Sequence, residues 1–488
     1  WIPQITMNLG FIINTLGKIA VIIGLFMATS FAWVVYYGEY HMVESLLISS
    51  LLPIVLGVVM VLFTRHRKKS INMPDRYLIV SVAWLYIGVI GALPFFISGY
   101  IPNFIDAFFE SVSGFTTTGC TILTDIEALP YSLLFWRSLT HWIGGMGIIV
   151  LVIAVFPMFK VSGYQIFSLE ASGLLNQKLK PRTTDIAKLL WIIYISITAI
   201  LVVLLLIGGM NLFESLCHAF GTLGTGGFST KNASITNYSS FIQYTIATFM
   251  VLSGANFTLY YSLIKGDFKR IFNNSELKFY LLIIGFVTLT ITLVLFFKNN
   301  LGLESSFRHS FFQVASIITT TGYATADYLQ WPTQAWILLF LLLFVGGCVG
   351  STSGGIKVIR HLVVLKYLRK HVSNLIHPNA LVSVKINKKT VHDHQAQAVI
   401  MFIMLYLTIF AAGYVIMSIL GLDMQTSLGS VAACLGCVGP GIGTVGPAAN
   451  FFHIPEFGKI TLSILMIVGR LELFTFMIIL MPSFWRSN

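Results

Sequence analysis

The sequence predicts an all-α integral membrane protein, in which four helix–half-helix–helix repeats surround a common axis and two additional transmembrane helices precede them. Three observations support this fold class: an apolar composition, ten apolar stretches of membrane-spanning length, and four similar Gly-rich turns. Of the 488 residues, 56% are hydrophobic and 10% are charged, whereas a soluble domain carries about 25% charged residues. The composition therefore argues against a soluble enzyme, a disordered chain and a nucleic-acid-binding protein.

Ten apolar stretches satisfy the requirement of about 20 residues for a helix that crosses the hydrocarbon core. They lie at 10–37, 44–64, 77–99, 133–158, 187–209, 237–264, 277–297, 335–365, 396–420 and 457–481. Four shorter apolar segments would reach only about 20 Å at ~1.5 Å per residue, and each leads into a Gly-rich run. They lie at 103–117, 211–224, 304–320 and 423–437. This pattern is typical of half-helices whose return strands line an aqueous cavity.

The basic residues predict the orientation of the chain. Of the 30 Lys and Arg residues, 22 lie in the segments 65–76, 159–188, 265–278 and 357–389. All four segments fall on one side if the ten long stretches span and the short ones return, and the positive-inside rule places this side in the cytoplasm. We therefore expect both termini in the cytoplasm. Because the chain opens on Trp1, we interpret residues 1–6 as a stretch added before Met7.

The four Gly-rich turns indicate an internal repeat. Aligning Gly119, Gly226, Gly322 and Gly439 gives spacings of 107, 96 and 117 residues. Each glycine follows a spanning stretch and a short one and precedes another spanning stretch, which favours a repeat over four unrelated loops. The expected units are two N-terminal helices in 1–76 and repeats in 77–160, 161–270, 271–385 and 386–488.

The turns are suited to binding a dehydrated cation. A ring of four extended turns can present backbone carbonyls in place of the hydration shell, and glycine permits the unusual backbone angles that such turns need. No acidic cluster accompanies them, which argues against a divalent-cation site. The candidate filter residues are Thr117, Thr118, Gly119, Gly224, Thr225, Gly226, Thr320, Thr321, Gly322, Cys437, Val438 and Gly439.

The eighth apolar stretch should unwind in its middle. Residues 345–357 contain five glycines and three hydroxyl residues, and each Gly inside a helix costs about 1 kcal/mol. Non-helical backbone at membrane depth must line a cavity or be buried in protein. The loop is either a gate or a helix break that only relieves packing. The candidate gate residues are Gly346, Gly347, Gly350, Ser351, Thr352, Ser353, Gly354, Gly355 and Arg470.

Arg470 is a charged residue within the last apolar stretch. A charge there costs about 2.5–3.5 kcal/mol on insertion scales, so we expect it to face a cavity or a partner. Glu472 lies about 200° away around a helix and is not the expected partner. Arg470 either lies beside the pore, where it repels cations, or joins an ion pair or caps loop carbonyls.

Other polar residues allow more than one interpretation. Acidic residues near the predicted outer side either concentrate cations or cap helices and solvate loops. They are Asp106, Asp125, Glu127, Asp327 and Asp423, together with Glu110 and Glu214 within or beside the short segments. Arg137 and His141 are interpreted as anchors at the membrane interface. The sequence contains no nucleophile–base pair, zinc motif or phosphate-binding loop, so we expect neither enzymatic activity nor a cofactor in this chain.

Four motifs resemble those of a known family. They are FTTTGCT at 115–121, GTGGFS at 224–229, TTTGYAT at 319–325 and CVGPGIGTVGP at 437–447. Through them, and over essentially its whole length, the chain resembles the Trk/Ktr/HKT superfamily of potassium transporters, most closely its bacterial TrkH-type membrane subunits. The resemblance implies four M1–P–M2 repeats, each similar to a potassium-channel subunit, around one pore. It also implies K⁺ at the filter and a mobile gate loop at 346–357 that works with Arg470.

The resemblance carries further expectations. A serine in place of the first filter glycine accompanies sodium transport in this superfamily, so Gly119 favours potassium. The family implies a homodimer in the bacterial inner (plasma) membrane, with nucleotide-binding TrkA-like regulatory subunits on the cytoplasmic face. The basic segments 159–188 and 357–389 are the expected docking sites, and the nucleotide would belong to the partner. A proton- or sodium-coupled symporter and a receptor or scaffold without transport are the alternatives.

Overall fold

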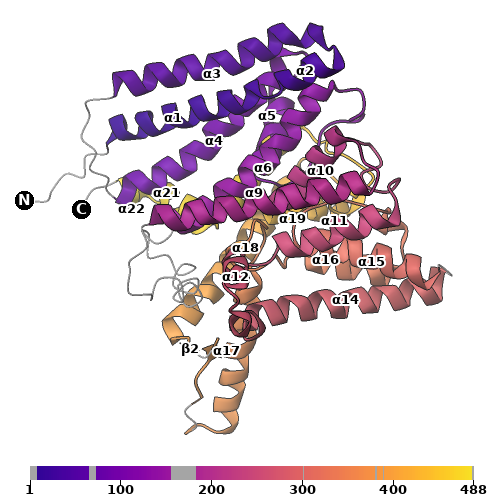
Figure 1. The fold of residues 1–488 in the computed structure, drawn as a ribbon. Coiled ribbons are helices and arrows are strands. Elements are labelled where there is room, and N and C mark those ends of the chain that lie inside the picture. The colour runs from indigo at the N-terminus through magenta and orange to yellow at the C-terminus, as the bar shows by residue number, and fades with distance from the viewer. Residues whose placement is uncertain are drawn as a thin grey trace, which may run out of the picture.

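The structure of the protein, a computed structural model, describes residues 8–64, 73–154, 183–299, 302–379, 382–387 and 389–485. Long helices form a bundle, and shorter helices are packed between them (Figure 1). Within the described ranges, six helices are long and apolar enough to cross a membrane, or seven if one sharply bent pair counts as a single span. The protein is therefore a multi-pass, all-α membrane protein, as predicted.

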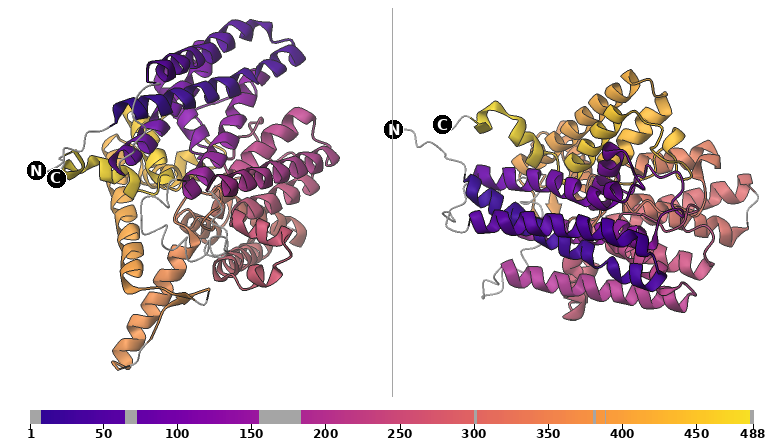
Figure 2. Two further views of the ribbon diagram at one scale, coloured as in Figure 1. Left: turned by 60° about the vertical axis from the view of Figure 1, so that its left-hand side comes forward. Right: turned by 90° about the horizontal axis from the view of Figure 1, so that it is seen from above.

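Two N-terminal spans pack closely as a hairpin at one side of the bundle (Figure 2). The first consists of α1 (Leu9–Ala28) and α2 (Phe31–Tyr37), and the second is α3 (Val43–Phe63). A Cβ on Gly17 would lie 2.8 Å from the carbonyl oxygen of Gly57, and a Cβ on Gly57 would lie 2.4 Å from that of Gly17. Small residues allow this close approach, which is the usual way in which helices associate in lipid.

The rest of the bundle repeats one order of elements. The first helices are α4 (Met73–Ile97), α9 (Thr183–Ile207), α14 (Ser275–Asn299) and α18 (Asp393–Ile419). The half-helices are α5 (Phe104–Phe115), α10 (Leu212–Gly224), α15 (Leu303–Ile318) and α19 (Met424–Gly436). The second helices are α6 (Tyr131–Ala154), α11 (Ser240–Ser253) with α12 (Phe257–Ile264), α16 (Thr333–Leu342) with α17 (Val358–Ile376), and α20 (Glu456–Arg470) with α21 (Phe474–Leu480).

The half-helices agree with the predicted short segments, and local sequence explains where they begin. Side chains of Asn103, Asn211 and Asp423 accept hydrogen bonds from the first-turn amides of α5, α10 and α19. Asn and Asp are preferred at this N-cap position because they satisfy amides that have no partner within the helix. The C-terminal turns of the half-helices are buried in the centre of the protein.

Two predicted spans are wrong as continuous helices. The stretch 237–264 is broken after Ser253, and its two helices meet at 96°. Gly254 favours the break, and the side chain of Asn256 accepts a hydrogen bond from Thr258 N to begin α12. The stretch 457–481 is broken after Arg470, where Glu472 and Leu473 adopt positive φ angles of 57° and 50°. The interruption predicted for 345–357 is confirmed, since α16 ends at Leu342 and α17 begins at Val358.

Several smaller elements complete the described chain. They are η1 (Tyr40–Met42), α13 (Phe268–Phe272), η2 (Tyr328–Gln330), β1 (Lys385–Ile386), β2 (Lys389–Thr390), η3 (Gly443–Val445) and α22 (Pro482–Trp485). The two strands pair antiparallel, and α17 projects away from the bundle beside them (Figure 1). Residues 1–6, interpreted above as an added stretch, lie outside the described residues. So do most of the basic segments 65–76 and 159–188.

Candidate cation pathway

The four half-helices end in the same backbone motif. The residue after each helix or its cap is left-handed: Thr117, Thr225, Thr320 and Cys437 have φ angles of 54°, 56°, 56° and 53°. The next residue donates its amide to the carbonyl five positions back, at 2.8–2.9 Å in all four turns. Such a Schellman turn normally uses glycine at the left-handed position. A β-branched residue there is a strained outlier of a kind that clusters at functional sites.

The turns meet in a closed ring. A Cβ on Gly119 would lie 2.1 Å from the carbonyl oxygen of Gly226, and one on Gly227 would lie 2.0 Å from that of Thr321. Likewise, a Cβ on Gly322 would lie 2.3 Å from the carbonyl oxygen of Val438, and one on Gly439 would lie 2.8 Å from that of Thr118. Each turn therefore contacts the next, and the fourth contacts the first. Only glycine fits these positions, which also have positive φ angles of 77–101°.

This geometry corrects the register that was predicted for the second turn. Gly227, rather than Gly226, has the positive φ angle and the contact with the following turn. The equivalent residues are thus Thr225, Gly226 and Gly227. Gly224 ends α10, where its Cβ would lie 2.5 Å from the carbonyl oxygen of His141. The sequence GTGG offers two possible alignments, and only the backbone conformation distinguishes them.

A cavity of about 160 Å³ opens on one side of the ring. Gly119, Gly227, Gly322 and Gly439 all line it, so every turn contributes to its floor. Its charged lining side chains, among the described residues, are those of Arg137 and Lys231. The cavity therefore lies on the axis of the ring but lacks an acidic lining in the described part of the chain.

The acidic residues considered in the sequence are used elsewhere. Glu110 forms a buried ion pair with Arg137 at 2.7 Å, and Asp106 forms one with Lys459 at 2.6 Å. Asp327 accepts from the amide of Leu329 in η2, and Asp423 caps α19. The remaining three bond to neighbouring loop groups or lie near Lys231: Asp125, Glu127 and Glu214. Capping and ion pairing account for these contacts.

Arg137 and His141 are buried behind the first two turns, so their interpretation as membrane-interface anchors is wrong. Besides its pair with Glu110, Arg137 donates to the carbonyl of Ser229 at 3.0 Å and lies 3.4 Å from the centre of the Phe228 ring. His141 Nε2 accepts from Phe228 N at 3.2 Å, so its Nδ1 carries the proton and donates to Gly114 O at 2.7 Å. Both side chains therefore join the first repeat to the second.

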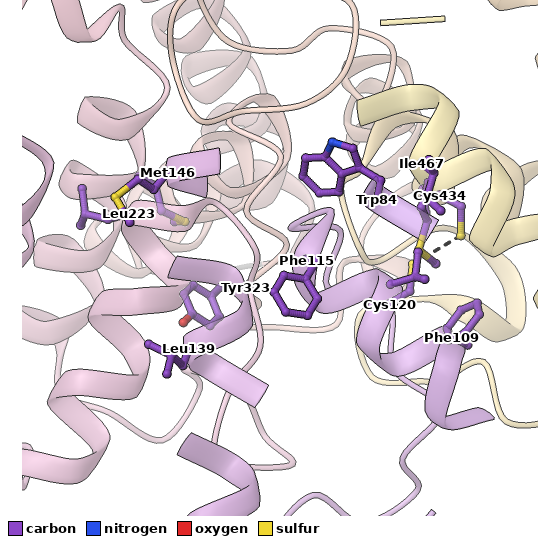
Figure 3. Close-up of a cluster of buried hydrophobic side chains, with 14 of the residues drawn as sticks. Trp84, Phe109, Phe115, Cys120, Leu139, Met146, Leu223, Tyr323, Cys434 and Ile467 are labelled. Atoms are coloured by element: carbon purple, nitrogen blue, oxygen red, sulfur yellow. Dashed lines mark hydrogen bonds between the residues drawn. The ribbon is translucent and has the colours of Figure 1, made fainter. Parts of the chain in front are cut away.

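Similar contacts tie the other turns together. Figure 3 shows the buried side chains around the first turn, with Cys120 close to Cys434 of the fourth repeat. Their sulfur atoms are 3.5 Å apart, and Cys120 Sγ donates to the carbonyl of Gly439 at 3.2 Å. Tyr323 of the third turn donates to the carbonyl of Phe228 in the second at 3.2 Å. The ring is thus held by polar contacts between repeats as well as by packing.

The loop between α16 and α17, residues 343–357, lies against the ring on the side of the half-helix ends. Gly354 N donates to Thr320 Oγ1 at 2.6 Å. A Cβ on Gly354 would lie 2.7 Å from the carbonyl oxygen of Gly436 and 2.8 Å from Cys437 Cβ. The loop is buried along most of its length. The candidate gate residues therefore lie directly next to two of the four turns.

Arg470 reaches this loop from α20. Its Nη1 donates to the carbonyl of Thr352 at 2.8 Å and its Nη2 to that of Gly144 at 3.4 Å. The side chain is buried, and its Nε has no hydrogen-bond partner among the described residues. Glu472 lies at the break after α20 and pairs with Arg360 at 2.5 Å, not with Arg470. Arg470 thus makes the loop-carbonyl contact that was one of its two predicted roles.

Two features next to the loop were missed in the sequence. At the break in the second helix of repeat two, the carbonyl of Gly254 accepts a hydrogen bond from Cys348 N of the loop. The helix-stop residue Gly254, followed by the N-cap residue Asn256, is a signal that could have revealed it. Glu276, in the first turn of α14, is fully buried and accepts a hydrogen bond from Val349 N at 2.8 Å.

The fold and this ring define a class: multi-pass membrane proteins in which four half-helices end in turns that meet in one ring. Comparison with known proteins identifies the family within this class. Residues 44–487 match the TrkH family of cation transport proteins, and the chain belongs to this family. It is accordingly a multi-pass membrane transporter.

Individual relatives agree along almost the whole chain. The Trk system potassium uptake protein TrkH of Halomonas elongata is 35% identical over 485 residues, which cover 99% of this chain and 100% of that protein. The protein of the same name from Escherichia coli K12 is 38% identical over 429 residues, or 87% of this chain and 88% of that protein. The crystal structure of the potassium transporter TrkH from Vibrio parahaemolyticus matches with a TM-score of 0.90 and 32% identity, covering 98% of this chain and 100% of that chain.

Proposed function

We propose that this chain takes up potassium across the bacterial inner membrane through the ring of four turns. The closed ring of glycine–carbonyl contacts is the observation that carries the proposal. Backbone carbonyls can replace the hydration shell of a monovalent cation without a fixed negative charge, and the half-helix C-termini add partial negative charge next to them. The names of the relatives, which are potassium uptake proteins, support potassium as the ion.

The proposed binding residues follow the corrected register. In each turn, the residue before the positive-φ glycine supplies a carbonyl that lies between neighbouring turns. The left-handed residue before it supplies a second carbonyl. The proposed filter thus consists of Thr117, Thr118, Gly119, Thr225, Gly226, Gly227, Thr320, Thr321, Gly322, Cys437, Val438 and Gly439.

We further propose that residues 346–357 gate the passage from the cytoplasmic side and that Arg470 holds them closed. The contacts of Gly354 with Thr320, and of Arg470 with Thr352, support this role, because they hold the loop against the third turn and bind it to a buried charge. A positive charge at this depth also opposes the passage of cations. A helix break that only relieves packing would not require contacts with both the filter and a buried arginine.

Replacement of Arg470 by alanine should therefore increase potassium flux. The change removes a charge-assisted hydrogen bond, worth about 1.5–3 kcal/mol, which corresponds to an increase of about tenfold to hundredfold in the open population. Flux of ⁸⁶Rb⁺ into proteoliposomes measures the effect. Arg470→Lys, which keeps the charge but cannot reach both carbonyls, should fall between the wild type and Arg470→Ala. Unchanged or lower flux in Arg470→Ala would contradict the gating role.

The proposed transport is channel-like, with a coupled symporter as the alternative. Coupling generally needs an ionisable site at the pathway, and the cavity next to the ring lacks acidic lining residues in the described part of the chain. We expect purified protein in liposomes to carry potassium down its gradient, with the same rate when a proton gradient is imposed. A flux that depends on protons would establish a symporter. Absence of any potassium flux would contradict the proposed function and favour the alternative of a receptor or scaffold without transport.

Assembly is a further part of the proposal. We propose a homodimer with cytoplasmic, nucleotide-binding TrkA-like subunits, consistent with relatives that are named as parts of a Trk system. The projecting helix α17 and the strands β1 and β2 offer a basic surface for such a partner, with Lys366, Arg369, Lys370 and Lys385. The described part of segment 357–389 is therefore the first place to test docking. The nucleotide would be bound by the partner.

A further inference from the structure

The loop of residues 343–357 is held by contacts that do not involve Arg470. The broken second helix of repeat two forms one set. Cys348 N donates to the carbonyl of Gly254 at 2.8 Å, and Phe257 N donates to the carbonyl of Gly350 at 3.1 Å. Thr352 Oγ1 donates to the carbonyl of Ser253 at 3.3 Å. These bonds use backbone groups that a continuous helix would keep for itself, so the break makes them available to the loop.

Glu276 forms a second hydrogen bond to the loop, independent of the contacts with repeat two. Its side chain is fully buried, and its Oε1 accepts the amide of Val349, one residue after Cys348. A carboxylate in such a place is costly unless hydrogen-bonded. The amides of two successive loop residues are therefore bound by two different elements, α14 and the break after α11. While both bonds are intact, they hold residues 348 and 349 in place against these two elements.

Other charged side chains bind the loop or lie near its C-terminal end. Lys357, at the end of the loop, donates from Nζ to the carbonyl of Ser353. Arg360 in α17 pairs with Glu472 at the break after α20, and Arg470 binds Thr352. Glu276 is the acidic group on the side of repeat three. The loop is consequently fixed from both sides, by Arg470 of repeat four and by Glu276 together with repeat two.

We propose that Glu276 and the helix break at 253–257 form a latch that keeps the intramembrane loop closed, distinct from Arg470. The inference rests on the proposed gating function of the loop and assigns positioning residues to it. Opening then requires release of the Val349 amide from Glu276 and of the Cys348 amide from Gly254. A conformational change that straightens the second helix of repeat two would remove the carbonyl acceptors and open the passage.

The test combines flux with hydrogen exchange. Glu276→Gln keeps the shape of the side chain and a neutral oxygen that can accept the Val349 amide. Because a hydrogen bond to a charged group is stronger than one to a neutral group, the substitution should shift the closed–open equilibrium of the loop by about fivefold to tenfold. We expect ⁸⁶Rb⁺ flux without partner subunits to increase by this factor. Thr352→Val removes only the bond to Ser253 and should increase flux about threefold. In both variants, the amides of residues 346–356 should exchange faster in detergent, as measured by mass spectrometry.

Controls separate the latch from unrelated effects. Glu304→Gln neutralises an exposed carboxylate of α15 that pairs with Arg308 and should change neither measurement. Thr352→Ser keeps the hydroxyl and should therefore retain the loop's protection from exchange. The comparison of Thr352→Ser with Thr352→Val tests the latch even if Glu276→Gln does not fold. Unaltered exchange and flux in Glu276→Gln and Thr352→Val, or a decrease in flux, would overturn the latch. Absence of flux in the wild-type protein would instead contradict the proposed function, while exchange would still report on the latch.

Discussion

Gly119→Ser should lose most of its preference for potassium over sodium. A Cβ at this position would lie 2.1 Å from the carbonyl oxygen of Gly226, so one oxygen of the ring must move. Overpacking of this kind costs about 1–3 kcal/mol. If this penalty falls only on the potassium-bound ring, the selectivity for potassium should fall by about fivefold to hundredfold. The φ angle of 86° adds strain for any side chain. The ratio of potassium to sodium flux in proteoliposomes measures the result.

Gly285→Ser is a matched control for this prediction. Gly285 lies in α14, and a Cβ there would meet no heavy atom within 4 Å. The same substitution should leave the potassium-to-sodium ratio unchanged, because it introduces no contact with the ring. An unaltered ratio in Gly119→Ser, in a protein that still transports, would show that the ring does not select the ion.

Arg137→Met should strongly destabilise the folded protein. Arg137 and Glu110 are both almost completely buried, at 2% and 0% exposure of their side chains, and are 2.7 Å apart. Removal of one partner from a buried ion pair costs about 3–5 kcal/mol, because the remaining charge has no counter-ion. Glu110 also accepts from Ile122 N behind the first turn, so the loss should spread to the ring. Thermal unfolding in detergent, followed by size-exclusion chromatography, measures the effect.

Two further variants make this prediction specific. Lys370→Met removes one partner of the exposed pair with Asp393, which is 2.6 Å long, and should cost about 1 kcal/mol or less. Arg137→Met combined with Glu110→Gln should recover part of the lost stability, since no uncompensated charge then remains. A melting temperature of Arg137→Met equal to that of Lys370→Met would contradict the structural importance of the buried pair.

The sequence predicted the helices best where the pattern was local. The four half-helices agree with the structure because each combines an apolar segment of limited length with an N-cap or a Gly-rich end. The interruption at 345–357 was also predictable, since five glycines in one stretch oppose a helix. The break at Gly254 was missed because the apolar character of 237–264 continues across it, and hydropathy does not report where a long apolar stretch bends.

The positions of buried charges could not be predicted from residue type. Arg137 and His141 occur near the start of a spanning stretch, where a basic residue usually marks the membrane boundary, yet they lie inside the protein against the first two turns. Glu276 occupies the first turn of α14, a usual place for a solvated acid, yet it binds the intramembrane loop. In each case the partner is distant in the sequence, and only packing brings it near.

Composition and local backbone preferences were sufficient to predict the membrane class, the repeat and three of the four positive-φ glycines in the turns. The sequence also supplied the resemblance to the family, which the whole-chain match to TrkH proteins confirmed. The register of the second turn, in contrast, follows only from the contact of Gly227 with Thr321 across the ring. The tertiary structure likewise decided that Glu276, the break after Ser253 and Arg470 meet at one loop. Such contacts depend on how repeats pack around an axis, and no local pattern encodes that arrangement.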